Sequence, residues 1–171
     1  DMTSSRGLGD VYKRQWYAPD HVRSWRKDIY HQIGGHNKDL SICDDHELMI
    51  RTYMVTKMHH IKKPLYVYRV TGDNTWLERN EKIQTETKRL FNENAYALAE
   101  RDADLRGLLK VDIGGGLFPR PGYMTIDQEG ADVNWDLNLG IPLEDNSVGV
   151  LNASHIIEHL RDPIRTMSEI H

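Results

Sequence analysis

Residues 108–137 read LLKVDIGGGLFPRPGYMTIDQEGADVNWDL, in which an apolar segment, three consecutive glycines and two further apolar segments follow one another. This alternation predicts strands over residues 108–113, 123–127, 131–137 and, further along the chain, 148–153. A helix is expected to follow over residues 156–170. Strands of this composition joined by short connections are typical of a parallel sheet, so the predicted fold class is α/β.

The glycine cluster and the acid that follows it have a chemical use. Without Cβ atoms, Gly114–Gly116 can turn sharply and bring backbone N–H groups close to a ligand. Asp127, at the tip of the next predicted strand, can accept hydrogen bonds from both hydroxyls of a ribose. Pro119 stands where a dinucleotide fingerprint has its third glycine, and no phosphate-binding helix fits before Tyr123. The pattern therefore disfavours a diphosphate ligand.

These residues, with ADVNWDL at 131–137 and IPLEDNSVGVLNASHIIEHLRDPIRTMSEI at 141–170, resemble the first part of a class I S-adenosylmethionine-dependent methyltransferase. The branch is one often associated with surface polysaccharide genes. The resemblance implies a partial Rossmann-like sheet over residues 106–171, with the second half of the sheet beyond His171, and S-adenosylmethionine as cofactor. In that family the glycine turn lies under the methionine and ribose, the acid after the second strand binds the ribose, and the acid after the third strand lies near the adenine amino group. The implied cofactor-binding residues are Asp112, Gly114, Gly116, Asp127 and Asp136.

Residues 155–159, HIIEH, also match a different signature. In the H-x-x-E-H pattern of inverted zinc peptidases, two histidines on one helical face bind zinc and the glutamate acts as base. A third, acidic ligand would have to come from Asp162 or Glu169. We favour the alternative in which Glu158-His159-Leu160 matches the methyltransferase helix after the fourth strand and no metal binds. His155 would then be a candidate general base that faces the methyl acceptor.

The upstream segment HVRSWRKDIYHQIGGHNKDLSICDDHELMIRTYMVTKMHHIKKPLYVYR, residues 21–69, resembles the C-terminal half of a family 2 glycosyltransferase of the GT-A type. The resemblance implies that Asp45 is the base that deprotonates the acceptor hydroxyl. Its neighbour Asp44 is expected to raise the Asp45 pKa through like-charge repulsion. In the alternative interpretation, Asp45 is an N-cap acid of a helix that contains Leu48 and Ile50. The intact domain would use a nucleotide-sugar and a divalent metal, and its D-x-D motif would lie upstream.

Between the two resemblances, apolar residues at three- and four-residue spacing predict an amphipathic helix over about residues 77–102, ended by Gly107. A strand is expected at Leu65–Tyr68, directly after Pro64. Residues 1–15 resemble a translated sequencing-adapter readthrough and are set aside as a non-native or disordered segment. The expected organisation is thus the end of a glycosyltransferase domain at 16–75, a linking helix at 76–105 and the start of a methyltransferase domain at 106–171.

Composition restricts the partners. The chain of 171 residues has a formal net charge of -4, and the charge changes from 17 basic and 15 acidic residues in 1–103 to 5 and 11 in 104–171. An acidic chain lacks the basic surface that nucleic acids select. No apolar run is long enough to span a membrane, and the single cysteine, Cys43, excludes an internal disulfide, so we expect a cytoplasmic location.

The sequence as a whole predicts the central fragment of a bifunctional protein that builds and methylates a bacterial surface glycan, with a glycan or small-molecule acceptor as partner. The alternative is a truncated fragment that keeps its fold and has no catalytic activity. In either case both sites are incomplete within these residues, and we expect the fragment alone to be inactive.

Overall fold

The computed structural model describes residues 22–59, 61, 63–67, 80–116 and 118–170. The chain divides into two compact units, residues 1–98 and 99–171. The division lies inside the long helix α5, Asn80–Arg106, so this helix contributes its first part to one unit and its last two turns to the other. Residues 1–15 lie outside the described part of the chain.

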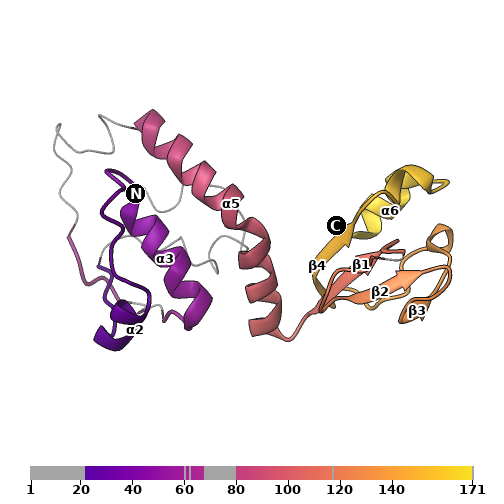
Figure 1. Ribbon diagram of the computed structural model, residues 1–171, viewed down its shortest axis with the longest axis horizontal. Coiled ribbons are helices and arrows are strands. Elements are labelled where there is room, and N and C mark those ends of the chain that lie inside the picture. The colour runs from indigo at the N-terminus through magenta and orange to yellow at the C-terminus, as the bar shows by residue number, and fades with distance from the viewer. Residues whose placement is uncertain (1–21, 60, 62, 68–79, 117, 171) are drawn as a thin grey trace. The chain divides into compact units, whose positions relative to one another are not determined.

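The second unit is built on a four-stranded sheet in the order β3-β2-β1-β4 (Figure 1). The strands are β1 Leu109–Ile113, β2 Met124–Asp127, β3 Val133–Asn134 and β4 Val148–Ala153. Every neighbouring pair is parallel, with Val111 opposite Met124 in β2 and opposite Leu151 in β4. The structure thus confirms the expected α/β class and parallel sheet, although β3 is much shorter than the predicted 131–137.

The two faces of this sheet carry separate clusters of buried residues. Because successive strand residues point to opposite faces, Leu151 packs with one cluster and Val150 with the other. The larger cluster is formed by Val111, Ile113, Ile126 and Leu137, and residues of β4 and of the segment after it pack against it. On the other face the last turns of α5 approach closely, since a Cβ atom at Gly149 would lie 2.7 Å from the Ala103 Cβ. Gly149 therefore permits the contact between helix and sheet.

The segment after β4 differs from the predicted helix over 156–170. It forms a short 3-10 turn, η2 Ile157–His159, and then a separate helix, α6 Pro163–Ile170. The helix begins where local chemistry places a start: Pro163 occupies the first helical position, and the Asp162 carboxylate accepts a hydrogen bond from the Arg165 N–H at 2.9 Å. The tripeptide 158–160 is consequently not part of a long helix.

The predicted linking helix is confirmed as α5, and Gly107 ends it. Gly107 has φ +66°, and the N–H groups of Gly107 and Leu108 donate to the carbonyls of Asp104 and Ala103. This is the Schellman arrangement, in which a left-handed residue, most often glycine, lets the chain leave the helix and turn into the next element.

The first unit contains α2 Lys27–Gln32 and α3 Asp44–Val55, together with the first part of α5. Its core consists of Cys43, Met49, Ile50, Leu90 and Leu98, so α3 and α5 pack through apolar side chains. Trp25 is fixed by a 2.8 Å hydrogen bond from its indole N–H to the Thr52 hydroxyl. The sequence correctly predicted the helix that contains Leu48 and Ile50.

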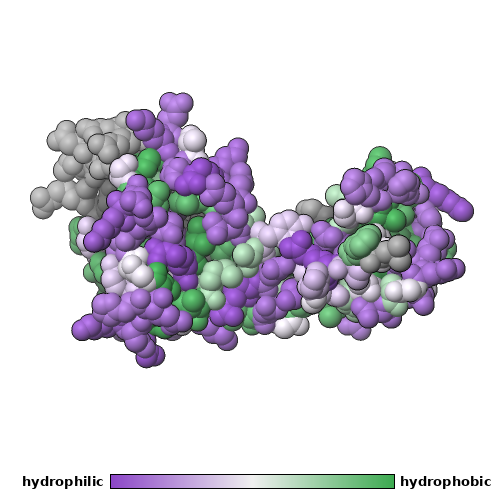
Figure 2. All heavy atoms as spheres, in the orientation of Figure 1, coloured by the Kyte–Doolittle hydropathy of each residue, from purple (hydrophilic) through white to green (hydrophobic). Residues whose placement is uncertain are grey.

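The strand expected at Leu65–Tyr68 is not formed over residues 65–67, and Tyr68 lies outside the described residues. The physical reason is pairing: a strand needs a neighbour for its N–H and C=O groups, and the described part of the first unit contains no other strand. Hydrophilic residues cover most of the visible surface of each unit (Figure 2). Across the described ranges, no helix is both long enough and apolar enough to cross a membrane.

Candidate functional site

The polar residues predicted from the sequence gather at one edge of the sheet. Because all four strands are parallel, their carboxyl ends share that edge. The chain proceeds outward from β1 to β2 and β3 and then returns to β4 on the other side of β1, so the strand order reverses between β1 and β4. Open parallel sheets bind ligands beyond the carboxyl ends of the strands at such a reversal. The turn Gly114–Gly116 and the residues after Ala153 flank this point.

The two glycines of the turn that have a positive φ, Gly114 and Gly116, differ in their surroundings. Gly114 has φ +67°, and a Cβ there would lie 2.5 Å from the Ile156 Cβ, so the chain after β4 requires glycine at this position. Gly116 also has a positive φ, +53°, but nothing lies within 4 Å of the position where its Cβ would stand. Gly116 therefore leaves open space at the edge of the sheet, where a ligand can approach the backbone, whereas Gly114 serves packing.

Asp127, the last residue of β2, is held by backbone N–H groups. One carboxylate oxygen accepts from the N–H of Gly116 at 3.1 Å, and the other accepts from the N–H of Gln128 at 2.7 Å. A carboxylate has about four acceptor positions, so both oxygens retain capacity for further donors. The arrangement joins the glycine turn to the acid and presents a fixed pair of acceptors.

Asp112 is only 1% exposed and has two partners from other segments. One oxygen accepts from the Arg120 backbone N–H at 2.7 Å, and the other accepts from the Asn152 side-chain amide of β4, also at 2.7 Å. A buried carboxylate needs such donors to offset its desolvation. The structure therefore places Asp112 as a link among β1, the loop before β2, and β4. The sequence analysis missed Asn152, because only the sheet brings it beside Asp112.

The loop before β2 is also attached to α5. Glu100 accepts hydrogen bonds from the Tyr123 hydroxyl at 2.8 Å and from the Arg120 guanidinium at 3.2 Å. Burial of Tyr123, together with the hydrogen bond and negative charge of Glu100, raises the pKa of Tyr123 to about 12. This contact fixes the short connection of ten residues, 114–123, that joins β1 to β2 in parallel.

Asp136 follows β3 and is half-buried. Its Oδ1 accepts two hydrogen bonds from Asn138, from the backbone N–H at 3.0 Å and from the side-chain amide at 2.8 Å. The bond from the Asn138 backbone N–H, which has the largest effect, and the bond from its side chain lower the pKa of Asp136 below its usual range. Together with the charge of Arg161 they outweigh desolvation, which acts in the opposite direction. Asp136 and Asp127 are connected through the backbone, since the Trp135 N–H donates to the Asp127 carbonyl at 2.7 Å.

His155 lies just beyond β4 with φ +54°, an unusual conformation for a residue other than glycine. Its side chain is 92% exposed, and its Nδ1 lies 3.4 Å from a Glu158 oxygen. The zinc-peptidase alternative requires His155 and His159 on one face of a helix, but only His159 belongs to the short turn η2. Within the described ranges, no three His, Cys, Asp or Glu side chains are grouped in a way that could hold a metal ion.

In the first unit, Asp45 lies in the first turn of α3 and forms an ion pair with Arg23. Burial raises the pKa of Asp45, but the hydrogen bond and charge of Arg23, with the charge of His46, outweigh it, so that the pKa is lowered. The expected rise of the Asp45 pKa caused by Asp44 is therefore wrong: the cation opposite Asp45 has the larger effect. Asp44 itself faces His36, with 3.8 Å between their closest nitrogen and oxygen.

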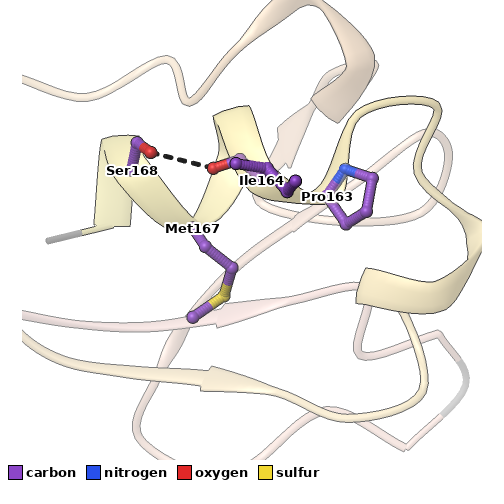
Figure 3. A pocket seen from close by; sticks show the side chains of 4 residues that line it. All are labelled: Pro163, Ile164, Met167 and Ser168. Carbon is purple, nitrogen blue, oxygen red and sulfur yellow. Dashed lines mark hydrogen bonds between the residues drawn. The ribbon is translucent and has the colours of Figure 1, made fainter.

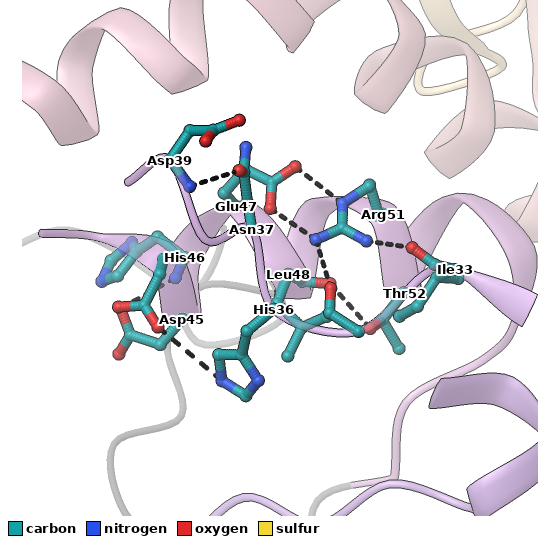
Figure 4. A network of polar contacts seen from close by, with 12 residues as sticks. Ile33, His36, Asn37, Asp39, Asp45, His46, Glu47, Leu48, Arg51 and Thr52 are labelled. Carbon is teal, nitrogen blue, oxygen red and sulfur yellow. Dashed lines mark hydrogen bonds and ion pairs between the residues drawn. The ribbon is translucent and has the colours of Figure 1, made fainter. Parts of the chain in front are cut away.

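Arg51 organises the loop between α2 and α3 (Figure 4). Its guanidinium forms an ion pair with Glu47 at 2.6 Å and donates to the backbone carbonyls of Ile33 and Gly35. A cavity of about 360 Å³ lies beside this cluster, lined by residues 34–38 with Glu47 and Arg51. Asp44, Asp45, the glycines at 34 and 35, and Arg51, all from the segment that resembles a glycosyltransferase, thus lie within one local structure.

A second cavity, of about 380 Å³, lies on α6 (Figure 3). Its lining is formed by Pro163, Ile164, Met167 and Ser168, and the Ser168 hydroxyl donates to the Ile164 carbonyl at 2.9 Å. None of the predicted site residues lines it. Comparison of the chain with models of known protein families, with curated proteins and with solved structures found no match.

Proposed function

We propose that the second unit is the cofactor-binding part of an S-adenosylmethionine-dependent methyltransferase with a Rossmann-like sheet. The observation that carries the proposal is the reversal of strand order between β1 and β4, where an open glycine turn and the carboxylate of Asp127 are hydrogen-bonded to each other. Asp127 is suited to a ribose, because a carboxylate with two oriented oxygens can accept from two neighbouring hydroxyls.

The remaining residues at this edge fit the same ligand. Asp136 is ionised and suits a neutral N–H donor such as the adenine amino group, while Gly116 leaves space for close approach of the ligand to the backbone. Asp112 and Gly114 hold the turn against the segment that contains β4: Asp112 accepts a hydrogen bond from Asn152, and Gly114 packs closely against Ile156. S-adenosylmethionine would supply an electrophilic methyl group. His155 is exposed beside this point and would accept the proton that the methyl acceptor, a glycan or a small molecule, loses.

Isothermal titration calorimetry of the chain with S-adenosylmethionine tests this proposal. We expect Asp127→Asn to weaken binding by about ten- to a hundredfold, because charge-assisted hydrogen bonds to the ribose are lost. Asp145→Asn is the matched control, since it removes the same charge from an exposed position on the loop before β4 and should leave binding unchanged. Absence of binding, or equal binding by Asp127→Asn, would favour a fragment that keeps the fold without the chemistry.

For the first unit we propose, as a second candidate, the acceptor side of a nucleotide-sugar-dependent GT-A glycosyltransferase. The supporting observation is that Arg51 joins Gly35 to Glu47 in the helix that begins with Asp44 and Asp45. A lowered pKa keeps Asp45 in the deprotonated form that a base requires but makes it a weaker proton acceptor, so the Arg23 ion pair would have to open during reaction. Among the described residues, no three His, Cys, Asp or Glu side chains are grouped so that they could hold a metal ion.

The test of this second proposal is sugar transfer by the protein from the complete reading frame. With nucleotide-sugar donors supplied, Asp45→Asn is expected to abolish transfer, while Asp44→Asn should retain most of it. Equal activity of Asp45→Asn and wild type would exclude Asp45 as the base.

A further inference from the structure

Asn138, which no sequence pattern indicates, forms hydrogen bonds through its backbone N–H and through both polar groups of its side chain in the loop after β3. The backbone N–H and the side-chain amide both donate to Oδ1 of Asp136, at 3.0 and 2.8 Å. The side-chain carbonyl oxygen accepts from the backbone N–H of Arg161 at 2.8 Å, from a segment 23 residues further along the chain. Asn138 thus connects the acid after β3 to the segment between η2 and α6.

The two donors of Asn138 meet the same oxygen of Asp136. Within the described ranges no hydrogen bond reaches the other oxygen, Oδ2, which leaves one oxygen fixed and one able to accept from a ligand. Rotation of the carboxylate would break the 2.8 Å contact with the side chain of Asn138. An acceptor held in one orientation before the ligand arrives has less conformational entropy to lose on binding.

Residues of α6 also hold the loop after β3 in place. Glu169 accepts from the Ile141 N–H at 2.9 Å, and Arg165 donates to a Glu169 oxygen at 3.0 Å. The Trp135 indole N–H donates to the Gly140 carbonyl at 2.9 Å, which closes the loop upon itself. Asn138 is the residue in this network that contacts the carboxylate directly.

We propose that Asn138 is the positioning residue for Asp136: it holds the Asp136 carboxylate in place for the N–H donor of a purine ligand. Through its bond to the Arg161 N–H, Asn138 also ties the orientation of this carboxylate to the segment between η2 and α6. The identity of the ligand rests on the function proposed above, whereas the action of Asn138 on Asp136 does not. Arg161 on this segment is the charged side chain that acts on Asp136. Arg165 and Glu169 of α6 bond to Leu139 and Ile141 of the same loop, and the Trp135 N–H links the residue before Asp136 to the Asp127 carbonyl.

Nuclear magnetic resonance titration of the Asp136 side-chain carboxyl tests the proposal. In the wild type, we expect the Asn138 side-chain amide signals to titrate together with Asp136. The Asp136 pKa should rise in Asn138→Ala, which removes one donor, and rise further in Asn138→Asp, which replaces that donor with a like charge while an acceptor for Arg161 remains. The matched control is Asn134→Ala, which should leave the Asp136 pKa unchanged, because the Asn134 side chain accepts a hydrogen bond from the Ala131 N–H.

A second measurement follows the dissociation constant of S-adenosylmethionine against pH. Because a protonated Asp136 cannot accept at both oxygens, binding weakens as pH falls through its pKa, and Asn138→Ala should move this transition to higher pH. At neutral pH the variant should bind about three- to tenfold more weakly, the loss typical of one hydrogen bond.

The two measurements separate the possible failures. An Asp136 pKa that is equal in the wild type and folded Asn138→Ala and Asn138→Asp overturns the positioning role, whatever binds. If the variants do not fold, an Asn138 amide that fails to titrate with Asp136 in the wild type overturns it as well. Absence of S-adenosylmethionine binding by the wild type counts against the proposed function alone.

Discussion

The glycine turn after β1 offers a matched pair of substitutions, Gly114→Ala and Gly116→Ala. Both residues have positive φ, +67° and +53°, so each new Cβ should cost about 1–2 kcal/mol in backbone strain. At Gly114 the Cβ would also stand 2.5 Å from the Cβ of Ile156, far inside the roughly 3.5–4.0 Å of a normal carbon contact. Relieving such overpacking costs about 1–3 kcal/mol more.

We therefore expect Gly114→Ala to lower the free energy of unfolding of the second unit by about 2–5 kcal/mol, and Gly116→Ala by about 1–2 kcal/mol. Urea unfolding should be followed on backbone amide resonances of β1 and β2, because these report on this unit alone. When combined with Gly114→Ala, the substitution Ile156→Ala should recover part of the extra loss of stability at Gly114. It removes Cγ1 and Cδ1 of Ile156, two of the three atoms that the new Cβ at position 114 would meet.

Equal destabilisation by the two glycine substitutions would refute this reasoning, because it would mean that Ile156 does not restrict the turn. A retained difference without any recovery in the double variant would show that the backbone, rather than the Ile156 side chain, limits the space.

Three further outcomes can be measured. Arg51→Lys should destabilise the first unit by about 1–3 kcal/mol, because lysine cannot form the forked contacts of the guanidinium. The control Arg89→Lys, on the exposed face of α5, should change the stability of this unit by less than about 0.5 kcal/mol. Hydrogen exchange of the α3 backbone amides would measure both effects. Tyr123, with its pKa raised to about 12, should be ionised later than an ordinary tyrosine in an alkaline absorbance titration. The stability it contributes should be complete below about pH 10 and lost as pH rises towards 12, and Tyr123→Phe should remove this dependence. Asp162→Ala should lower helix stability by about 1 kcal/mol through loss of the N-cap bond to Arg165, read from α6 amide exchange, and unchanged exchange would exclude the cap.

The local elements of the fold were largely predictable. Apolar runs between turn residues located β1, β2 and β4, and Gly107 indicated the end of α5, because apolar runs, turn residues and helix caps are patterns among residues near one another in sequence. The same reasoning failed at residues 156–162, where the apolar pattern continued but Asp162 and Pro163 set a new helix start. It also failed at Leu65–Val67, where β-forming residues found no strand to pair with among the described residues.

The candidate site divides in the same way. Sequence alone determined that glycines follow the first strand and that Asp127 and Asp136 stand at the ends of the second and third strands, and in a parallel sheet this is enough to bring these two acids to one edge. Only the tertiary structure decided how the acids are held: Asn152 reaches Asp112 across 40 residues, and Arg161 meets Asn138 across 23. Strand ends follow from local periodicity, whereas the partners of a buried or oriented carboxylate are set by which distant segments the packed sheet brings within hydrogen-bonding distance.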